Sequence, residues 1–219
     1  PLTGLFHKYL NTITNKNLIY LNLGGFANVS IPNGSKLMSY DTGPANYLID
    51  AWCRERFDIE FDLNGRLASM GEIDHGVLKL MLKDKYFAKK PPKSTGFELF
   101  NMNWINKLLE KSLFSRDINI LATLTYLTVI TVSNDINKYK NKPDSIFFYG
   151  GGAFNKLIVQ GIIDLTKLKK VKSLRYGIDE KNLEATAFAW LASMRINEVK
   201  FPKSEITGTS KSYYLGNIY

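Results

Sequence analysis

The sequence predicts one α/β domain built on a mixed β-sheet. Near its start, β-rich segments at residues 18–23, 27–31 and 36–40 are separated by short turns rich in Gly and Pro, which predicts an antiparallel meander. From residue 145 onward, apolar strand-like segments alternate with helical ones, which predicts parallel strands joined by right-handed crossovers. Because no repeat, low-complexity tract or linker divides the chain, we expect a single domain over residues 1–219.

The composition favours a globular protein and disfavours several other classes. The 219 residues are 45% hydrophobic and 22% charged, which is enough apolar surface for a packed core. The net charge is +9, but Arg, the residue suited to bidentate phosphate and base contacts, is scarce beside Lys, so nucleic-acid binding is disfavoured. No apolar stretch approaches the roughly 20 residues that cross a bilayer, and the first residues do not resemble a signal peptide. The one cysteine, Cys53, is expected to pack on a helix, and a cytoplasmic protein is predicted.

The middle of the chain is predicted to be helical. Apolar residues at helical spacing predict a helix over residues 46–56, so that the end of the third strand and the start of this helix form one corner. Residues 57–93 are expected to form an excursion outside the sheet, with a helix over 73–83. Two further helices are predicted over 103–111 and 118–137; the second is rich in Thr and Val, and its length favours a helix.

The last part of the chain is predicted to complete the sheet. We expect a strand at residues 145–149, a helix at 155–164, a strand at 171–176 and a helix at 180–196.

Two glycine clusters lie between predicted elements. Gly24 and Gly25 join two strands, where the backbone could approach an anion, although a plain hairpin turn has the same pattern. A second cluster joins a strand to a helix, where it could lie flat against a nucleotide and present the helix N-terminus to its phosphates; it consists of Gly150, Gly151 and Gly152. It matches neither the P-loop nor the dinucleotide fingerprint. Asn155, which follows, could contact a nucleotide or cap the helix.

Asp41 is the candidate catalytic carboxylate. It lies at the carboxyl end of a predicted strand, where α/β folds place ligand chemistry, with Thr42 and Asn46 beside it at the corner. An Asp at this position could take a proton from water or hold a metal ion, or it could simply cap the next helix.

Two further segments carry polar side chains that could bind a ligand. Lys93, Ser94 and Thr95 follow two prolines in a stiff turn that could grip a polar ligand, although surface loops have similar sequences. The lysines of this region are expected to form a solvated face: Lys79, Lys83, Lys85, Lys89, Lys90 and Lys93. Glu184 lies on a helix of small residues that is expected to pack in the core, and its carboxylate could face the glycine loops.

Taken together and in this order, the segments resemble the anhydro-N-acetylmuramic acid kinases, bacterial sugar kinases with the actin-like, Hsp70-like ATPase fold, which is ribonuclease H-like. The resemblance covers nearly the whole chain. The matching segments are NLGGxAN at 22–28, DTGPxN at 41–46, DAW at 50–52, DxYF at 84–87, PPKSTGxE at 91–98, ATLT at 122–125, GGGAxN at 150–155, EAxAFAWLA at 184–192, TG at 207–208 and LG at 215–216.

The resemblance implies a reaction of cell-wall recycling in the bacterial cytoplasm. Water would open the 1,6-anhydro ring of the amino sugar while the γ-phosphoryl group of ATP, with Mg²⁺, moves to the freed 6-oxygen, giving N-acetylmuramic acid 6-phosphate. Asp41 would be the general base, Gly24 and Gly25 would lie on the phosphate side, and the loop at 150–152 with Asn155 would lie on the adenosine side. The expected sugar-binding residues are Asn28, Thr42, Asn46, Lys93, Ser94, Thr95 and Glu184. No metal ligand is assigned to this chain.

The chain also departs from the family pattern. The family begins with another domain that carries a first phosphate loop of the form Gly-Thr-Ser-x-Asp-Gly, which does not occur here, so residues 1–219 are predicted to be the C-terminal lobe with a helical excursion. A partner chain could supply the N-terminal lobe, a homodimer is left open, and an inactive remnant or subunit is the alternative. Ala45 replaces a glycine of the family and Phe97 an arginine, which removes backbone freedom and a guanidinium.

Overall fold

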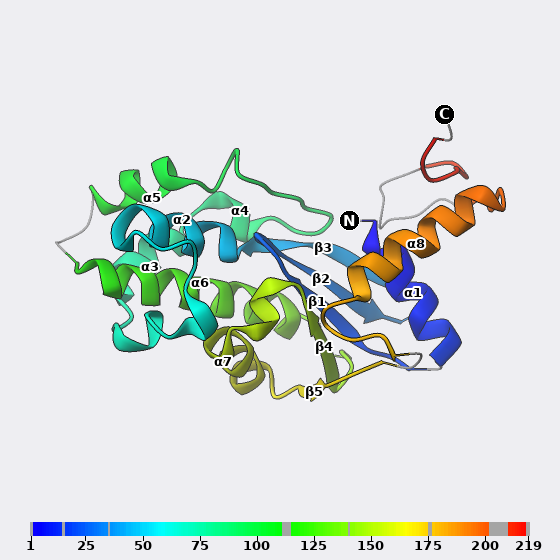
Figure 1. Cartoon of the computed structure of the whole chain (residues 1–219), viewed down its shortest axis with the longest axis horizontal. Helices are drawn as coiled ribbons and strands as arrows, with labels where there is room; N and C mark the ends of the chain where they lie inside the picture. The colour runs from blue at the N-terminus through cyan, green and yellow to red at the C-terminus, as the bar shows by residue number, and fades with distance from the viewer. Residues whose placement is uncertain are drawn as a thin grey trace.

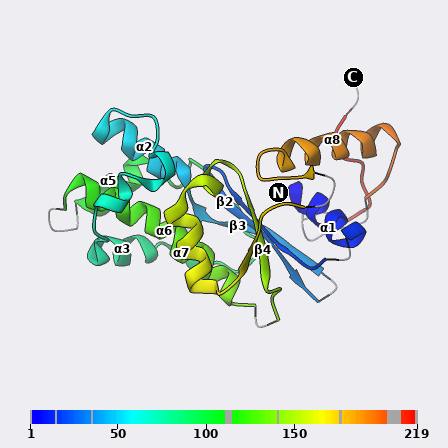
Figure 2. The ribbon, with the colours of Figure 1, turned by 60° about the horizontal axis from the view of Figure 1, so that its bottom comes forward.

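The structure, a computed structural model, describes residues 2–14, 16–34, 36–110, 115–139, 141–174, 177–201 and 210–217 (Figure 1). It is an α/β fold in which helices cover both faces of a twisted five-stranded sheet (Figures 1 and 2). No helix in these ranges is both long and apolar enough to cross a membrane.

The sheet has the strand order β3-β2-β1-β4-β5. The predicted meander forms from β1 (Ile19–Leu23), β2 (Phe26–Asn33) and β3 (Lys36–Pro44), which pair antiparallel. Strands β4 (Ser145–Tyr149) and β5 (Lys169–Val171) continue the sheet parallel to β1. Strand β2 therefore runs against the other four, which is the arrangement of the ribonuclease H-like lobe in the actin-like ATPase fold and confirms the predicted fold class.

One face of the sheet carries the main core. Three helices cover this face: α2 (Asn46–Phe57), α6 (Asp117–Asn137) and α7 (Lys156–Thr166). Alternate strand residues such as Leu21 and Val29 point into this core, because successive side chains of a strand face opposite sides. Cys53 of α2 is fully buried there, as predicted.

The other face is covered by α1 (Thr3–Thr14) and α8 (Leu183–Ile196), which pack against each other. Phe6 of α1 and Tyr20 of β1 are buried in this second core. No helix was predicted over residues 3–14, where the structure has α1.

The segment between α2 and α6 includes the excursion predicted over residues 57–93 and the helix predicted over 103–111, and most of it lies at the end of the molecule away from α1 and α8 (Figure 1). It contains two short 3-10 turns and three helices: η1 (Leu63–Gly65), η2 (Ala68–Met70), α3 (His75–Leu82), α4 (Lys85–Ala88) and α5 (Met102–Leu109). As predicted, none of its described residues joins the sheet.

One prediction near the C-terminal end is wrong, and one predicted helix begins later than expected. A strand was predicted over residues 171–176, but β5 ends at Val171; residues 175 and 176 lie outside the described residues. The helix predicted from residue 180 begins at Leu183, because Asp179 accepts hydrogen bonds from the backbone N–H groups of the turn that precedes it.

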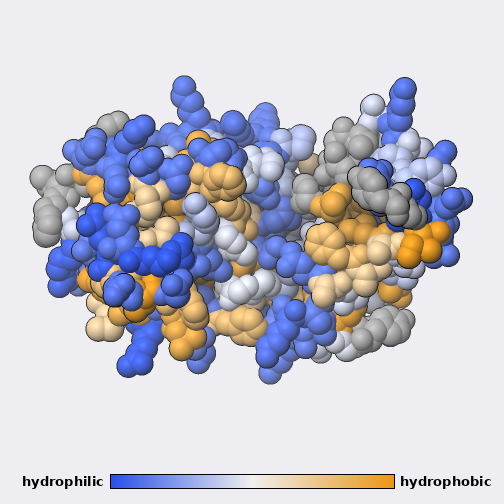
Figure 3. Space-filling model, turned by 45° about the horizontal axis from the view of Figure 1, so that its top comes forward, coloured by the Kyte–Doolittle hydropathy of each residue, from blue (hydrophilic) through white to orange (hydrophobic). Residues whose placement is uncertain are grey.

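The expectation that the small-residue helix packs in the core holds for one side of α8 only. Ala187 is buried, whereas Phe188 is 54% exposed. Apolar surface gathers at this end of the molecule (Figure 3), where Tyr9 and Ile13 of α1 are also exposed.

Candidate functional site

Asp41 lies near the carboxyl end of β3, at a β-bulge. Asn28 of β2 pairs with Asp41, while the preceding residue, Ala27, pairs with Gly43, so Thr42 is an extra residue in β3. Thr42 is fully buried, and its hydroxyl donates to the Ala27 carbonyl oxygen at 3.3 Å. Asp41 itself remains half-buried.

The Asp41 carboxylate accepts three hydrogen bonds. Asn28 Nδ2 donates to Oδ1 at 2.8 Å, and Oδ2 receives the Ser94 hydroxyl at 2.9 Å and the Thr95 N–H at 3.0 Å. A carboxylate has about four acceptor positions, so one remains for a further donor such as water. The predicted site residues Asn28, Ser94 and Thr95 are therefore brought together around Asp41.

Asp41 does not cap the helix that follows. The N-cap of α2 is Ala45, and no side chain caps this helix. Instead, the Gly24 carbonyl accepts from Asn46 N at 3.1 Å, and the Gly25 carbonyl accepts from Ala45 N at 2.9 Å. The structural alternative for Asp41 is thus excluded.

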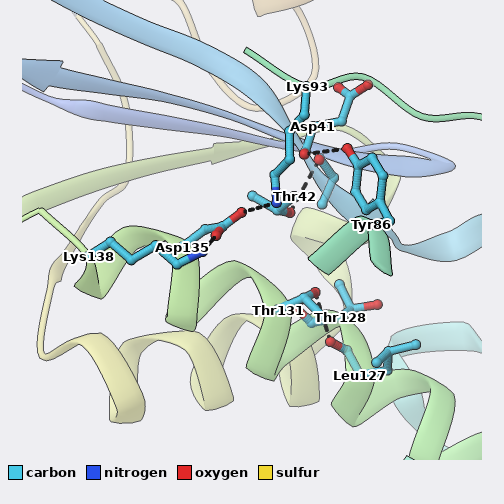
Figure 4. Close-up of polar contacts among 10 residues, drawn as sticks. Asp41, Thr42, Tyr86, Lys93, Leu127, Thr128, Thr131, Asp135 and Lys138 are labelled. Atoms are coloured by element: carbon cyan, nitrogen blue, oxygen red, sulfur yellow. Dashed lines mark hydrogen bonds and ion pairs between the residues drawn. The ribbon is translucent and has the colours of Figure 1, made fainter. Parts of the chain in front are cut away.

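Lys93 is buried, which contradicts the prediction that it belongs to the solvated lysine face, and its contact with the sugar stays a prediction. Its side chain is 2% exposed, and Nζ lies 2.9 Å from Asp135 Oδ2 on α6 (Figure 4). Lys138 pairs with the other carboxylate oxygen of Asp135. The other five lysines of that region are exposed, as predicted. Lys93, Thr42 and Asp135 also line a cavity of about 490 Å³ between β3 and α6.

The second glycine cluster is pressed against the end of β1. Gly150 has φ +82°, and a Cβ there would lie 2.4 Å from Asn22 Oδ1. A Cβ on Gly152 would lie 2.8 Å from Leu23 Cβ and 3.0 Å from Asn46 Oδ1. Asn46 Nδ2 in turn donates to the Leu23 carbonyl at 3.1 Å. The close approach, which only glycine permits, brings this cluster to Asn46 at the start of α2.

The first glycine cluster has a defined orientation. Because both of its carbonyls accept from α2, and the C=O and N–H of a trans peptide point in opposite directions, the N–H of Gly25 points away from that helix. Gly25 is exposed. This orientation is compatible with the predicted contact to phosphate, and that contact stays a prediction.

A second cavity, of about 600 Å³, joins several predicted nucleotide residues. It is lined by Asn46, Ile49, Asp50, Phe61, Asp62, Leu63, Asn64, Gly151, Gly152, Phe154, Asn155 and Lys181. Its volume is in the range of small-molecule sites. Phe61, Leu63 and Phe154 are partly exposed, at 56%, 64% and 43%. Phe61 and Leu63 were missed because the start of the excursion was interpreted only as a polar loop; Phe154, within the glycine-rich turn itself, was the available signal for an aromatic residue at this site.

Asn155 caps α7. Its Oδ1 accepts from Leu157 N at 3.1 Å and from Ile158 N at 3.3 Å, so the cap alternative is confirmed for this oxygen. A Cβ on Gly65, which has φ +75°, would lie 2.6 Å from the same oxygen, so the η1 turn packs closely on Asn155. Asn155 thus contacts both the start of α7 and the η1 turn, on two sides of the 600 Å³ cavity.

The acidic side of this cavity has an unusual carboxyl group. Burial raises the pKa of Asp50 to about 6, and the nearby carboxylates Asp62 and Glu60 act in the same direction. Arg54 opposes this shift. Among the described residues, no group of three or more His, Cys, Asp or Glu side chains is placed to hold a metal ion.

Glu184 lies apart from the other predicted site residues. It is exposed on α8 and lines neither of the two cavities described above. Burial raises the pKa of Tyr149 at the end of β4, and the charge of Glu184 contributes to the same shift. The role of Glu184 in sugar binding stays a prediction.

The family profile and the curated relatives that match this chain name the same family. The profile of the anhydro-N-acetylmuramic acid kinase family matches residues 1–219. The anhydro-N-acetylmuramic acid kinases of Vibrio parahaemolyticus serotype O3:K6 and Sulfurovum sp. strain NBC37-1 are both 36% identical to this chain, over 100% of its length and 60% of theirs. Among solved structures, the activator of 2-hydroxyisocaproyl-CoA dehydratase from Clostridium difficile, with bound ADPNP, is similar at a TM-score of 0.49 and 15% identity, over 93% of this chain and 69% of that one. The chain spans about 60% of the length of the curated relatives it matches, and it belongs to the anhydro-N-acetylmuramic acid kinase family.

Proposed function

We propose that this chain is the C-terminal lobe of a kinase that converts 1,6-anhydro-N-acetylmuramic acid, water and ATP into N-acetylmuramic acid 6-phosphate and ADP. The observation that carries the proposal is the Asp41 carboxylate, which three donors orient and which keeps one acceptor position free. Strands β1, β3 and β4 run parallel, so Asp41 and both glycine clusters lie toward the same edge of the sheet.

In this reaction Asp41 is the general base. It takes a proton from water while the water oxygen bonds to C1 of the sugar and the C1–O6 bond breaks. The freed O6 bonds to the γ-phosphorus of ATP, the bond from that phosphorus to the β,γ-bridging oxygen breaks, and ADP leaves. The proton on Asp41 then passes to solvent, which restores the carboxylate.

We place the nucleoside of ATP in the 600 Å³ cavity. Phe61 and Phe154 offer exposed aromatic rings at this cavity, and the glycine loop gives a flat backbone wall through Gly151 and Gly152. The Gly25 N–H is directed away from α2 and is available to a phosphate oxygen. Mg²⁺ would enter with ATP, whose phosphates supply much of its oxygen shell, and we assign no step to it.

The first phosphate loop of the family is proposed to act with this lobe, either in the same polypeptide or in a partner chain. Phosphoryl transfer depends mainly on positioning and on charge stabilisation, so half of the phosphate-binding apparatus would be a poor catalyst. The proposed reaction therefore requires both the sugar and the lobe that carries the first phosphate loop.

The test is a direct assay. The 219-residue chain is incubated with ATP, Mg²⁺ and 1,6-anhydro-N-acetylmuramic acid, with and without a polypeptide that carries the Gly-Thr-Ser-x-Asp-Gly loop, and the 6-phosphate is measured by mass. We expect slow turnover alone and turnover on the order of 1–100 per second in the combined assembly. An intact assembly that binds ATP and forms no 6-phosphate would contradict the proposal and favour an inactive remnant.

A further inference from the structure

We propose that the buried ion pair between Lys93 and Asp135 positions the catalytic carboxylate, by tying the loop that holds Asp41 to helix α6. The inference rests on the proposed function, because it assigns Lys93 and Asp135 as positioning residues for the same site.

Lys93 connects two parts of the molecule through different atoms. Its carbonyl oxygen accepts the Asp41 N–H at 3.2 Å, so its backbone lies alongside β3. Its side chain crosses toward α6, where Nζ lies 2.9 Å from Asp135 Oδ2 (Figure 4). On the way, Nζ lies 5.0 Å from the ring centroid of Tyr86 and 5.8 Å from that of Tyr40, which are cation–π distances. One residue thus links the backbone of Asp41 to a helix of the core.

The two residues after Lys93 supply two of the three hydrogen bonds to the Asp41 carboxylate. Ser94 is exposed and Thr95 is half-buried, and both donate to the same oxygen, Oδ2. Their hydrogen bonds are 2.9 and 3.0 Å long, so a displacement of the loop by roughly 1 Å would take both beyond hydrogen-bonding distance. The position of Lys93 therefore controls how Oδ2 is held.

Stability alone is a weak reason for this ion pair. The side chains of Lys93 and Asp135 are 2% and 4% exposed, and the desolvation of two such charges offsets much of their attraction. Replacing both members of a buried pair by apolar residues is often neutral or stabilising. In this chain the replacement would remove the contact that joins the Lys93 side chain to α6. Beyond packing, the ion pair contributes a fixed position for the loop that carries Ser94 and Thr95.

The main experiment replaces both charges together. Lys93→Met with Asp135→Leu keeps apolar volume at both positions and leaves no unpaired buried charge. Lys138→Met is the matched control, because it removes the exposed partner of the same carboxylate and leaves the Lys93–Asp135 contact in place. For each protein we would measure the thermal midpoint, hydrogen exchange of the Thr95 amide, and kcat and KM in the active assembly.

The positioning role predicts a specific combination of results. In the double variant the thermal midpoint stays near that of the parent, while exchange of the Thr95 amide becomes about tenfold faster. The value of kcat falls by on the order of 10²-fold, with little change in KM for ATP, because the base is misplaced while the nucleotide site is untouched. The Lys138→Met control should match the parent in all of these measurements.

Other results would overturn the inference. A stable double variant with the parent's Thr95 exchange and kcat would mean that the pair only fills space. If the double variant does not fold, hydrogen exchange in the parent protein decides. A Thr95 amide that is protected as strongly as the amides of the α6 turn around Asp135 supports the inference. A Thr95 amide that exchanges as fast as that of an unstructured loop contradicts it. Hydrogen exchange needs no turnover, so an inactive parent would count against the proposed function without affecting this test.

Discussion

At the scale of single residues, both ends of the Asn28 side-chain amide have a hydrogen-bond partner. The Asn28 amide donates to Asp41 through Nδ2 and accepts from the Ser39 hydroxyl at 3.5 Å through Oδ1. Ser39 contacts Ser30 at 2.9 Å, and Ser30 contacts His7 Nδ1 of α1 at 2.8 Å. This line of polar contacts on the α1 face of the sheet keeps the NH₂ group of Asn28, rather than its oxygen, toward the carboxylate.

The first prediction concerns Asp41 itself. Asp41→Asn is nearly isosteric, but its amide cannot take a proton from water, so we expect the rate of the active assembly to fall by roughly 10²–10⁴-fold. Nucleotide affinity and the thermal midpoint should change little. The comparison is the 6-phosphate formation rate and the midpoint of variant and parent; a stable, fully active variant would remove Asp41 from the base role.

The second prediction concerns His7 and pH. Burial lowers the pKa of His7 to about 3, and the ring is stacked on Tyr20 at 4.4 Å. The unfolded chain therefore binds a proton near the ordinary pKa of about 6.5 that the native state does not bind. The contribution of His7 to stability is complete above about pH 6.5, and as pH falls from there toward 3 it is lost at up to about 1.4 kcal/mol per pH unit.

Denaturant unfolding at several pH values between 4 and 7 checks this sign. We expect His7→Asn to lower stability at pH 7, because the ring is fully buried, and to remove this part of the pH slope. The exposed His75 offers the control, since His75→Asn should leave the slope of the parent. An unchanged slope in His7→Asn would show that His7 does not carry it.

At the scale of elements, the connections between strands and helices shape the site. The β-bulge at Thr42 sets the register in which Asn28 faces Asp41, and the turn after β4 packs on the end of β1 through Gly150 and Gly152. Both features depend on backbone geometry that a regular strand would not provide.

The third prediction tests the turn after β4. Gly150→Ala would place a Cβ 2.4 Å from Asn22 Oδ1 at a φ of +82°, so it should destabilise through steric contact as well as backbone strain. Gly34→Ala is the control, because Gly34 has φ +61° and nothing within 4 Å of its Cβ position. We expect a cost of about 1–2 kcal/mol for the control and a larger one for Gly150→Ala, measured by denaturant unfolding. Equal costs would mean that the turn after β4 can shift to accommodate the added Cβ without a further loss of stability.

At the scale of the whole molecule, the 600 Å³ cavity brings together segments that are far apart in the sequence. The start of α2, the turn around η1 and the turn around η3 each contribute one wall. Because each of the three contributes lining residues, we expect nucleotide binding to be sensitive to residues in the excursion as well as to the glycine loop.

The fourth prediction follows from that arrangement. Phe61→Ala should weaken ATP binding by about 5- to 100-fold, which corresponds to roughly 1–3 kcal/mol for stacking of a base on an aromatic ring. Met70→Ala is the control, because Met70 is 70% exposed and does not line the cavity. Titration of each variant with ATP by calorimetry measures the effect, and an equal affinity in both variants would place the base elsewhere.

Local sequence patterns were sufficient for most of the fold and for the position of Asp41, the proposed general base. The alternation of the strands, the helical spacing of α2, α6 and α7, and the place of Asp41 at a strand end depend on near neighbours along the chain, which is why periodicity predicts them. The end of β5 and the presence of α1 were not predicted, because their local sequence patterns are weak. Packing in the second core determines both.

The tertiary structure alone decided what the side chains of the site do. Nothing local to Lys93 predicts burial, because its partner Asp135 belongs to a helix that follows much later in the sequence. The sequence leaves open whether the Asn155 oxygen caps a helix, and the folded position of α7 decides that it does. Phe61 lines a cavity only because the excursion folds back on the glycine loop. Sequence patterns report which face of an element is apolar, whereas the pairing of buried polar groups depends on which distant elements meet.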